Sequence, residues 1–288
     1  TETVAATTGA EGAALDEPEE GETGETEDAG EGEEEAQPGE VVDGDVVVDA
    51  AERTKEAGSA RVSTSMTVGG DGVEDQTFGG EGVFSFDDDV GEVMLDLGGV
   101  EGATVRSARV VFADYVVYYG LPAGFLAGNK RWLKLDPQGL ADASAVDAGS
   151  LFLGSQADPA QFLLWLRAIG PTARRVGSET VRGEQTTRFD AVVDLRRLAS
   201  QGPEGQEDAW RAYVESTRER LGLAEIPVQV WVDGDGLVRR LRHGYVFGPE
   251  GQQARTSSVT ELWDFGVPVS VRTPPPGQVA DLADYVRP

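Results

Sequence analysis

Apolar and polar residues alternate most regularly between residues 226 and 247. Up to Asp233 every second residue is apolar, as in a strand that buries one face. Asp and Gly then alternate from Asp233 to Gly236, and both residue types tolerate the positive φ of a tight turn. This stretch therefore predicts a β-hairpin. Its first strand would turn four apolar side chains to one face: Ile226, Val228, Val230 and Val232.

Shorter segments with the same period precede and follow the hairpin, separated by turns rich in Gly and Asp. Together they predict about ten or eleven antiparallel strands. Glycines at 79, 80 and 82 fall inside one of these strands and predict strong curvature there. The other predicted strands are 60–68, 77–86, 92–97, 104–112, 115–120, 131–136, 173–182, 184–195 and 253–267.

Two longer segments have the helical period. The first, 158–170, begins with Asp158-Pro159 and stops at Gly170-Pro171. Only Arg167 is charged within it, so we expect this helix to be mostly buried. The second, 207–221, is amphipathic, and shorter helices are predicted at 46–58 and 138–154. Strands interrupted by helices in this order indicate an α+β fold with one curved sheet and helices on one side.

Two strands have irregular patterns. Val238 and Leu241 cannot share a face of a regular strand, which predicts a bulge, and we expect the regular pattern to fail first there. In 253–267, Val259, Trp263 and Phe265 share a face, but Glu261 falls on it too.

Charge divides the 288 residues into two parts. Residues 1–45 hold 17 of the 52 acidic residues and no Lys or Arg, which leaves 35 acids against 24 basic residues in the remainder. A segment this acidic, without an aromatic residue, cannot bury enough surface to fold. We expect residues 1–45 to be a disordered acidic tether, or else an acidic binding tail, and residues 46–288 to be the folded domain.

The chemistry-bearing residues are few. The chain has no Cys and one His, His243, and it has neither a GxSxG motif nor a phosphate-binding glycine motif. Asp87-Asp88-Asp89 lacks further ligands at calcium-binding spacing and is read as a turn, so no metal or cofactor is expected. The acidity argues against nucleic-acid binding. We therefore expect a protein that is not an enzyme.

One basic cluster, Arg239, Arg240 and Arg242, stands out from this acidic background. It would be either a solvated sheet face paired with nearby acids or a contact for anionic lipid headgroups. On the second reading, Arg240 and Arg242 are the candidate headgroup contacts.

Several runs, in order over about residues 46–288, resemble the LppX/LprG-type cell-envelope lipoproteins of actinobacteria, whose fold is related to the LolA/LolB carriers. They are Ser59-Ala60-Arg61, RWLKLD (131–136), the helix 158–170, VGSETVRGEQTTRFDAVVDL (176–195), PVQVWVDGDGLVRRL (227–241) and FGVPVSVRTPPPGQV (265–279). The resemblance implies a half-barrel with helices on its concave face and an apolar cavity for acyl chains between them. It also implies an acylated Cys and a removed signal peptide ahead of Thr1, and thus anchoring at the outer face of the cytoplasmic membrane.

The resemblance makes lipid or acyl-chain binding, for carriage or presentation, the leading expectation, by a monomer. The alternatives are a sensor or regulator that binds a protein partner at the envelope, and a structural surface domain with a filled core. A filled core and an open cavity need the same alternation, so the pattern does not separate them. The candidate lining residues are Phe84, Phe86, Phe162, Leu163, Leu166, Ile169, Phe189, Val193, Val228 and Val230.

Overall fold

The computed structural model describes residues 39–98, 105–135, 159–248 and 253–281. The chain divides into two units, Thr1–Glu35 and Ala36–Pro288, and all described residues belong to the second. The predicted helix 138–154 and almost all of the predicted tether lie outside the described residues.

The described residues form one open sheet of 13 strands in the order β1-β8-β9-β10-β11-β12-β2-β3-β4-β5-β6-β7-β13. All neighbouring strands are antiparallel except β13 and β7, which are parallel. The strands are β1 (Val41–Asp43), β2 (Ser59–Gly70), β3 (Val73–Ser85), β4 (Val90–Asp96), β5 (Ser107–Ala113), β6 (Val116–Gly120), β7 (Trp132–Leu135), β8 (Thr172–Val181), β9 (Glu184–Asp194), β10 (Glu225–Asp233), β11 (Val238–Phe247), β12 (Ala254–Trp263) and β13 (Val279–Asp281).

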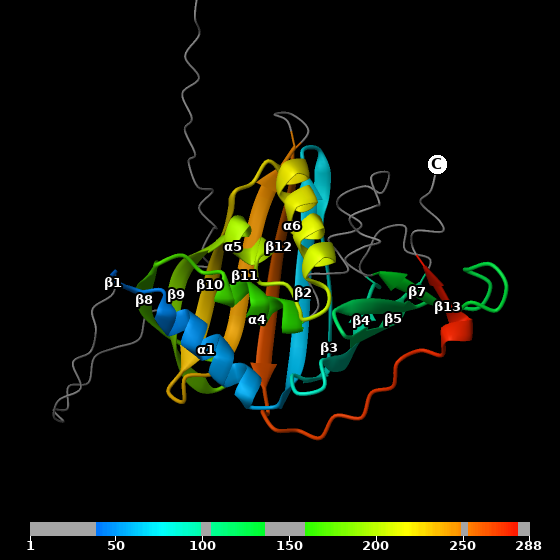
Figure 1. Cartoon of the computed structure of the whole chain (residues 1–288), viewed down its shortest axis with the longest axis horizontal. Helices are drawn as coiled ribbons and strands as arrows, with labels where there is room; N and C mark the ends of the chain where they lie inside the picture. The colour runs from blue at the N-terminus through cyan, green and yellow to red at the C-terminus, as the bar shows by residue number, and fades with distance from the viewer. Residues whose placement is uncertain (1–38, 99–104, 136–158, 249–252, 282–288) are drawn as a thin grey trace, which may run out of the picture. The chain divides into compact units, whose positions relative to one another are not determined.

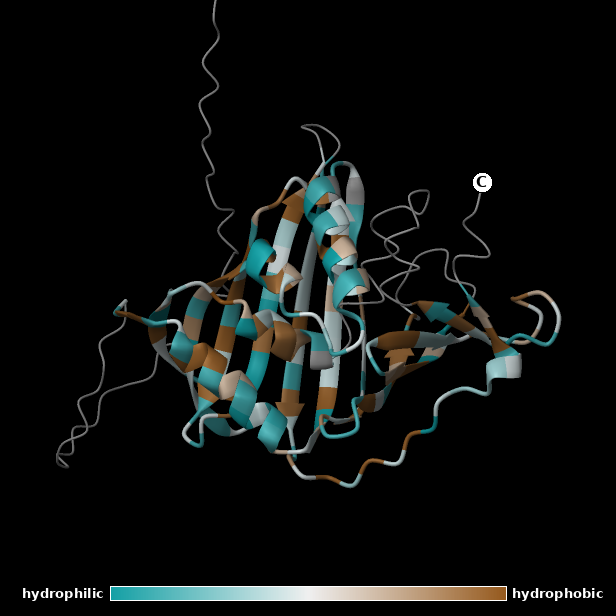
Figure 2. Cartoon of the chain, in the orientation of Figure 1, coloured by the Kyte–Doolittle hydropathy of each residue, from teal (hydrophilic) through white to brown (hydrophobic). Residues whose placement is uncertain are grey.

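The described residues include four α-helices, which lie on the same side of the sheet (Figure 1), and we call this side the inner face. They are α1 (Asp45–Glu56), α4 (Pro159–Arg167), α5 (Leu195–Ala199) and α6 (Glu207–Leu221), and a short 3-10 helix follows at Pro276–Gln278. Brown and teal alternate along the strands in Figure 2, as expected when one strand face is covered and the other is not. The predicted α+β class with a single open antiparallel sheet is confirmed.

The expected number of strands is too low, because β1 and β13 are three residues long and too short to show a period. β1 also lies inside the segment 1–45, where a tether was expected. It pairs with β8 through Val41 and Arg174, and so the sheet begins before the predicted domain boundary.

The predicted irregularity in β11 is a bulge at Arg239. Trp231 of β10 pairs with Arg240, whereas the next residue, Val232, pairs with Val238. The extra residue changes the phase of the strand. Val238 and Leu241 can therefore both point into the core, where they are 2% and 3% exposed.

The curvature predicted for the glycine-rich strand β3 corresponds to close backbone packing. A Cβ added at Gly80 would lie 2.2 Å from the carbonyl oxygen of Met94, and one at Gly82 would lie 1.8 Å from that of Glu92. Glycine is therefore required at both positions for β3 to approach β4 this closely.

Arg182, at the tip of the β8–β9 hairpin, reaches strands far from its own in the sheet order. Its guanidinium donates hydrogen bonds to Glu261 of β12 (2.6 Å) and to Ser63 of β2 (3.0 Å). It also lies over the Trp263 ring, 3.7 Å from the centroid. The hairpin tip therefore folds across the outer face of the sheet. Val181 beside it is only 1% exposed.

Glu261 joins this hairpin tip to the middle of the outer face. Its second oxygen accepts two hydrogen bonds from Arg240, at 2.9 and 2.7 Å. Burial by itself would raise the pKa of Glu261, but the hydrogen bonds from Arg240 and Arg182 outweigh it and lower the pKa. This carboxylate is therefore held in its charged form.

We expect Glu261→Gln to lower the free energy of unfolding at neutral pH by about 1–3 kcal/mol, because two guanidinium groups lose a charged acceptor. A group with a lowered folded pKa stabilises fully above its ordinary pKa, which is 4.5 here, and loses this contribution as the pH falls through the folded pKa. The difference between wild type and variant should therefore shrink below pH 4.5.

Urea unfolding at a series of pH values measures this difference. The control is Glu92→Gln, which removes an exposed partner of Arg109 and should cost less than about 1 kcal/mol. Equal losses in the two variants would contradict the structural role assigned to Glu261.

Candidate functional site

Helix α4 is apolar around most of its circumference and lies over the middle of the inner face. Six consecutive side chains of α4 are 8% exposed or less, the polar Gln161 and five apolar residues, and so are Ala168 and Ile169 just after the helix. Arg167 is the exception, and it pairs with Glu52 of α1 at 2.9 Å. The five apolar residues of the buried run are Phe162, Leu163, Leu164, Trp165 and Leu166.

The ten predicted lining residues all belong to the one hydrophobic core of the described residues, which contains α4 and extends well beyond it. Four come from α4 and the residues that follow it, and the others come from β3, its following turn, β9 and β10. Each is at most 6% exposed. The structure thus brings together every residue of the predicted apolar set, although their contact with a ligand stays a prediction.

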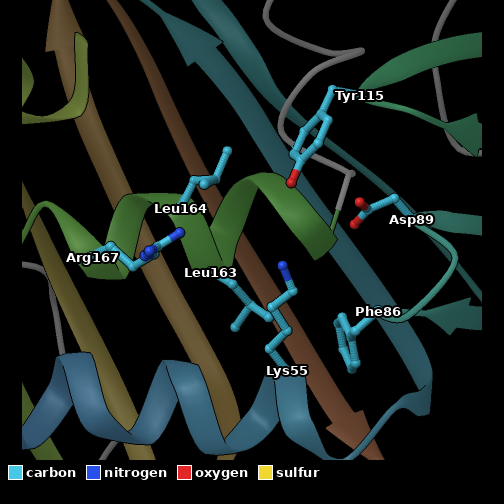
Figure 3. Close-up of a pocket in the computed structure, with 7 residues that line it drawn as sticks. All are labelled: Lys55, Phe86, Asp89, Tyr115, Leu163, Leu164 and Arg167. Atoms are coloured by element: carbon cyan, nitrogen blue, oxygen red, sulfur yellow. The ribbon is translucent and has the colours of Figure 1, made fainter. Parts of the chain in front are cut away.

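The space between α4 and the sheet is nearly filled. One cavity of about 20 Å³ lies between α4, α1 and the turn after β3, lined by Leu163, Leu164, Lys55, Phe86 and Asp89 among others (Figure 3). Burial raises the pKa of Asp89 there, and the nearby Lys55 opposes this shift. A second cavity, of about 10 Å³, lies below α4. Neither space holds more than a water molecule or so.

Sequence analysis did not identify the polar residues on the inner face under α4. In β12 the buried side chains are Leu262 and three residues with hydroxyls, Thr256, Ser258 (0% exposed) and Thr260 (3% exposed). The apolar residues Val259 and Trp263 point outward instead. His243 of β11 pairs with Ser258 across the sheet, so its side chain shares the inner face. The alternation of β12 is visible in the sequence, but it does not show which of the two faces is buried.

His243 packs against α4. Its ring centroid lies 4.9 Å from that of Trp165 and 5.8 Å from that of Phe162. The side chain is 1% exposed, and burial lowers its pKa to about 4, so the imidazole is neutral at neutral pH. His243 is thus part of the surface on which α4 packs.

The two candidate headgroup contacts lie on the opposite side of the sheet from the apolar set. Arg240 and Arg242 flank Leu241 in β11, and Leu241 points inward. Arg240 is engaged by Glu261 and lies over the Trp231 ring, 5.2 Å from its centroid. The predicted site is therefore split between two faces, and headgroup contact by these arginines stays a prediction.

The described ranges contain no group of three or more His, Cys, Asp or Glu residues placed to hold a metal ion. In the same ranges, no helix has the length and apolar character needed to cross a membrane. The buried side chains around α4 are mostly apolar, with Gln161, His243 and a few hydroxyls among them.

No protein-family model matches the chain. A protein of Streptomyces griseus, described as an uncharacterized 31.2 kDa protein in the rplA-rplJ intergenic region, is 24% identical over 203 residues, or 69% of this chain. The chain spans 62% of the length of that relative.

Solved structures similar to the chain include two mycobacterial lipoproteins. LppX of Mycobacterium tuberculosis is 12% identical with a TM-score of 0.44, and the match covers 79% of this chain and 99% of LppX. LprF of Mycobacterium bovis is 12% identical with a TM-score of 0.36, covering 80% and 96%. A LolA superfamily protein of Nitrosomonas europaea is 9% identical with a TM-score of 0.30, covering 77% and 92%. LppX and LprF carry names from the lipoprotein group that the sequence resembles.

We expect His243→Phe to remove a pH dependence of stability. The folded pKa of His243 is about 4, against 6.5 for the free side chain. Between these values the unfolded state binds a proton that the folded state does not, so stability falls as the pH falls, by about 1.4 kcal/mol per pH unit. The free energies of unfolding of wild type and variant, measured at several pH values, should differ by a constant above pH 6.5. Below pH 6.5 the wild type should lose stability relative to the variant. Parallel profiles throughout would contradict the buried, neutral state of His243.

Proposed function

We propose that this chain binds lipid acyl chains between the inner face of its sheet and helix α4, and that it acts as a carrier or presenter of lipid outside the cytoplasm. On this proposal it works by binding and not by catalysis. The observation that carries it is α4 itself, a short helix with five consecutive buried apolar side chains laid on an open sheet.

The contacts of α4 make it a replaceable cover. Just after the C-terminal end of α4, backbone hydrogen bonds fix the polypeptide to β9. The amide of Gly170 donates to the carbonyl of Val192 (2.9 Å), and the amide of Asp194 donates to the carbonyl of Ala168 (3.0 Å). Along its length, α4 is held by apolar packing and the half-exposed Arg167–Glu52 pair. Apolar packing has no directional requirement, and so an acyl chain can cover the same surface.

An entering acyl chain offsets the cost of lifting α4. Lifting α4 exposes apolar side chains on both the helix and the sheet, and each CH2 of an entering acyl chain recovers about 0.8 kcal/mol. Two acyl chains of ordinary length contain many such CH2 groups. Because the residual cavities are small, binding requires α4 to move.

The inner-face hydroxyls are consistent with a surface that is not permanently sealed. The hydroxyl oxygens of Ser258 and Thr260 are buried and have no hydrogen-bond partner within the described ranges. Burying such a group unpaired costs about 1–3 kcal/mol. A face that meets water or the ester groups of a lipid during its working cycle would recover that cost.

We expect the purified chain to bind a fluorescent diacylglycerol saturably, with one or a few lipids per chain. Fluorescence titration measures the affinity, and native mass spectrometry measures the stoichiometry. If the protein binds no diacylglycerol even when the lipid is in large excess, the proposal is wrong and a filled structural core is favoured.

Loosening α4 should increase the apparent affinity, because the binding-competent open state becomes more populated. Trp165→Leu removes the ring that packs on His243 without changing any of the ten predicted lining residues. We expect several-fold tighter diacylglycerol binding together with a loss of stability of about 1–4 kcal/mol.

The matched control for this variant is Trp210→Leu in α6. Trp210 is equally a buried tryptophan, but it packs beside α5 and donates its indole N–H to Leu198, 2.8 Å away. It should lose comparable stability with no gain in lipid affinity. A similar gain in both variants would show that general loosening, and not release of α4, admits the lipid.

A further inference from the structure

A cavity of about 250 Å³ lies where α1 passes the turn between β10 and β11. This volume is just below the range of roughly 300–1,000 Å³ that is usual for small-molecule pockets. Unlike the two spaces at α4, it has a mixed lining. Phe189, Val232, Val46 and Ala50 form apolar walls, while Arg53, Arg175, Asp49 and Asp233 bring charge.

Arg175 enters this cavity from the inner face of β8. It pairs with Phe189 across the sheet, so both side chains project to the same side. Its guanidinium carbon lies 5.6 Å from the centre of the Phe189 ring. The Nε atom of Arg175 is buried and has no hydrogen-bond partner within the described residues. A buried guanidinium N–H without an acceptor is costly and indicates that an acceptor is missing.

Arg53 enters the same cavity from α1. Val46, Asp49, Ala50 and Arg53 are spaced three and four residues apart, so they line one stripe of the helix. The Arg53 guanidinium lies against the turn at Gly236, where an added Cβ would be 2.7 Å from Nη1. No ion pair within 4 Å joins Arg53 to a carboxylate of the described ranges.

The two acids of the cavity differ in what they contribute. The charge of Asp233 is already engaged by other groups. Its Oδ2 accepts a hydrogen bond from Arg239, and its Oδ1 accepts from the amides of Asp235 (3.0 Å) and Leu237 (2.8 Å). Asp49 is exposed at the rim. Two guanidinium groups against one uncompensated carboxylate leave the cavity cationic, on a chain whose formal charge is −28.

We infer that this cavity binds a phosphate group, held between the guanidinium groups of Arg53 and Arg175. A guanidinium offers two parallel N–H donors that match two oxygens of a phosphate, and Nε is one of these donors. The apolar wall at Phe189 would receive the group that carries the phosphate. If that carrier is a lipid, the inference rests on the proposed function; if it is a soluble phosphate compound, it does not.

The first test is a calorimetric titration of the full chain with inorganic phosphate. We expect saturable binding that Arg175→Gln and Arg53→Gln each weaken by about tenfold, as for loss of a charged hydrogen-bonding partner. Asp49→Asn should tighten binding, because it removes the one opposing charge. Arg53 is exposed on its helix, so its variant tests the site even if Arg175→Gln does not fold.

The control is Arg174→Gln, which makes the same charge change one residue away. Arg174 lies opposite Asp190 in the register of β8 and β9, and its side chain points to the outer face. Phosphate affinity should therefore not change. Absence of saturable binding at millimolar phosphate would overturn the inference. An equal weakening by Arg174→Gln would also overturn it, since the response would then report net charge alone.

The second test compares fluorescent phosphatidic acid with the matching diacylglycerol. If the phosphate belongs to a lipid, phosphatidic acid should bind about tenfold more tightly than diacylglycerol, and Arg175→Gln should abolish this preference. Phosphate binding without such a preference assigns the cavity to a soluble phosphate compound. Diacylglycerol binding with neither phosphate binding nor a preference would overturn this inference alone and leave the proposed function standing.

Discussion

The need to cover the inner face of an open sheet determines most of this structure. A closed barrel buries its own interior, but a sheet with two free edges has to borrow a second layer from helices. Here three inner positions of β9, β10 and β11, namely Val193, Val230 and Leu241, are at most 3% exposed, and α1 and α4 lie over this part of the sheet. The bulge at Arg239 serves the same need, since without it Val238 would point away from the helices.

The outer face solves a different problem with a different chemistry. No helix of the described residues covers it, and its aromatic rings are shielded by arginines, with Arg182 over Trp263 and Arg240 over Trp231. Glu261 ties these cations together. Most arginines in the centre of the sheet are thereby committed to the fold. A cation that is free to meet an anionic ligand has to be sought elsewhere, and Arg53 and Arg175 meet that description at the end of the inner face.

The sequence predicted the parts of the fold that have a long, uninterrupted period. The hairpin of β10 and β11, the helices α4 and α6 and the bulge in β11 all follow from spacing alone. Strands β1 and β13 were missed because three residues define no period. The inner face of β12 was missed for another reason. Alternation says which residues share a face, but it does not say which face is buried, and here Ser258 and Thr260 face the core while Trp263 faces outward.

The burial of the ten apolar residues was predictable, but the shape of the space around them was not. All ten belong to the hydrophobic core, because each alternates toward the covered face of the sheet or lies on or beside a buried helix, and their role in binding a ligand stays a prediction. Whether they enclose a cavity depends on how far α4 sits from the sheet, and no residue pattern encodes that distance. The charged cavity was not predictable at all, since Arg53, Arg175 and Gly236 are far apart in the sequence and only the strand order brings them together.

Phe189 connects the two spaces. It belongs to the core that contains α4, and its ring also lies beside the guanidinium of Arg175 at the wall of the charged cavity. If both proposed ligands bind, an anion at Arg175 would lie beside a ring of the apolar face, and an acyl chain that displaced this ring would remove a neighbour of Arg175. The two proposed ligand contacts would then be coupled through one side chain. Linkage requires such a coupling to act equally in both directions, so occupancy of the charged cavity and opening at α4 should influence each other by the same free energy.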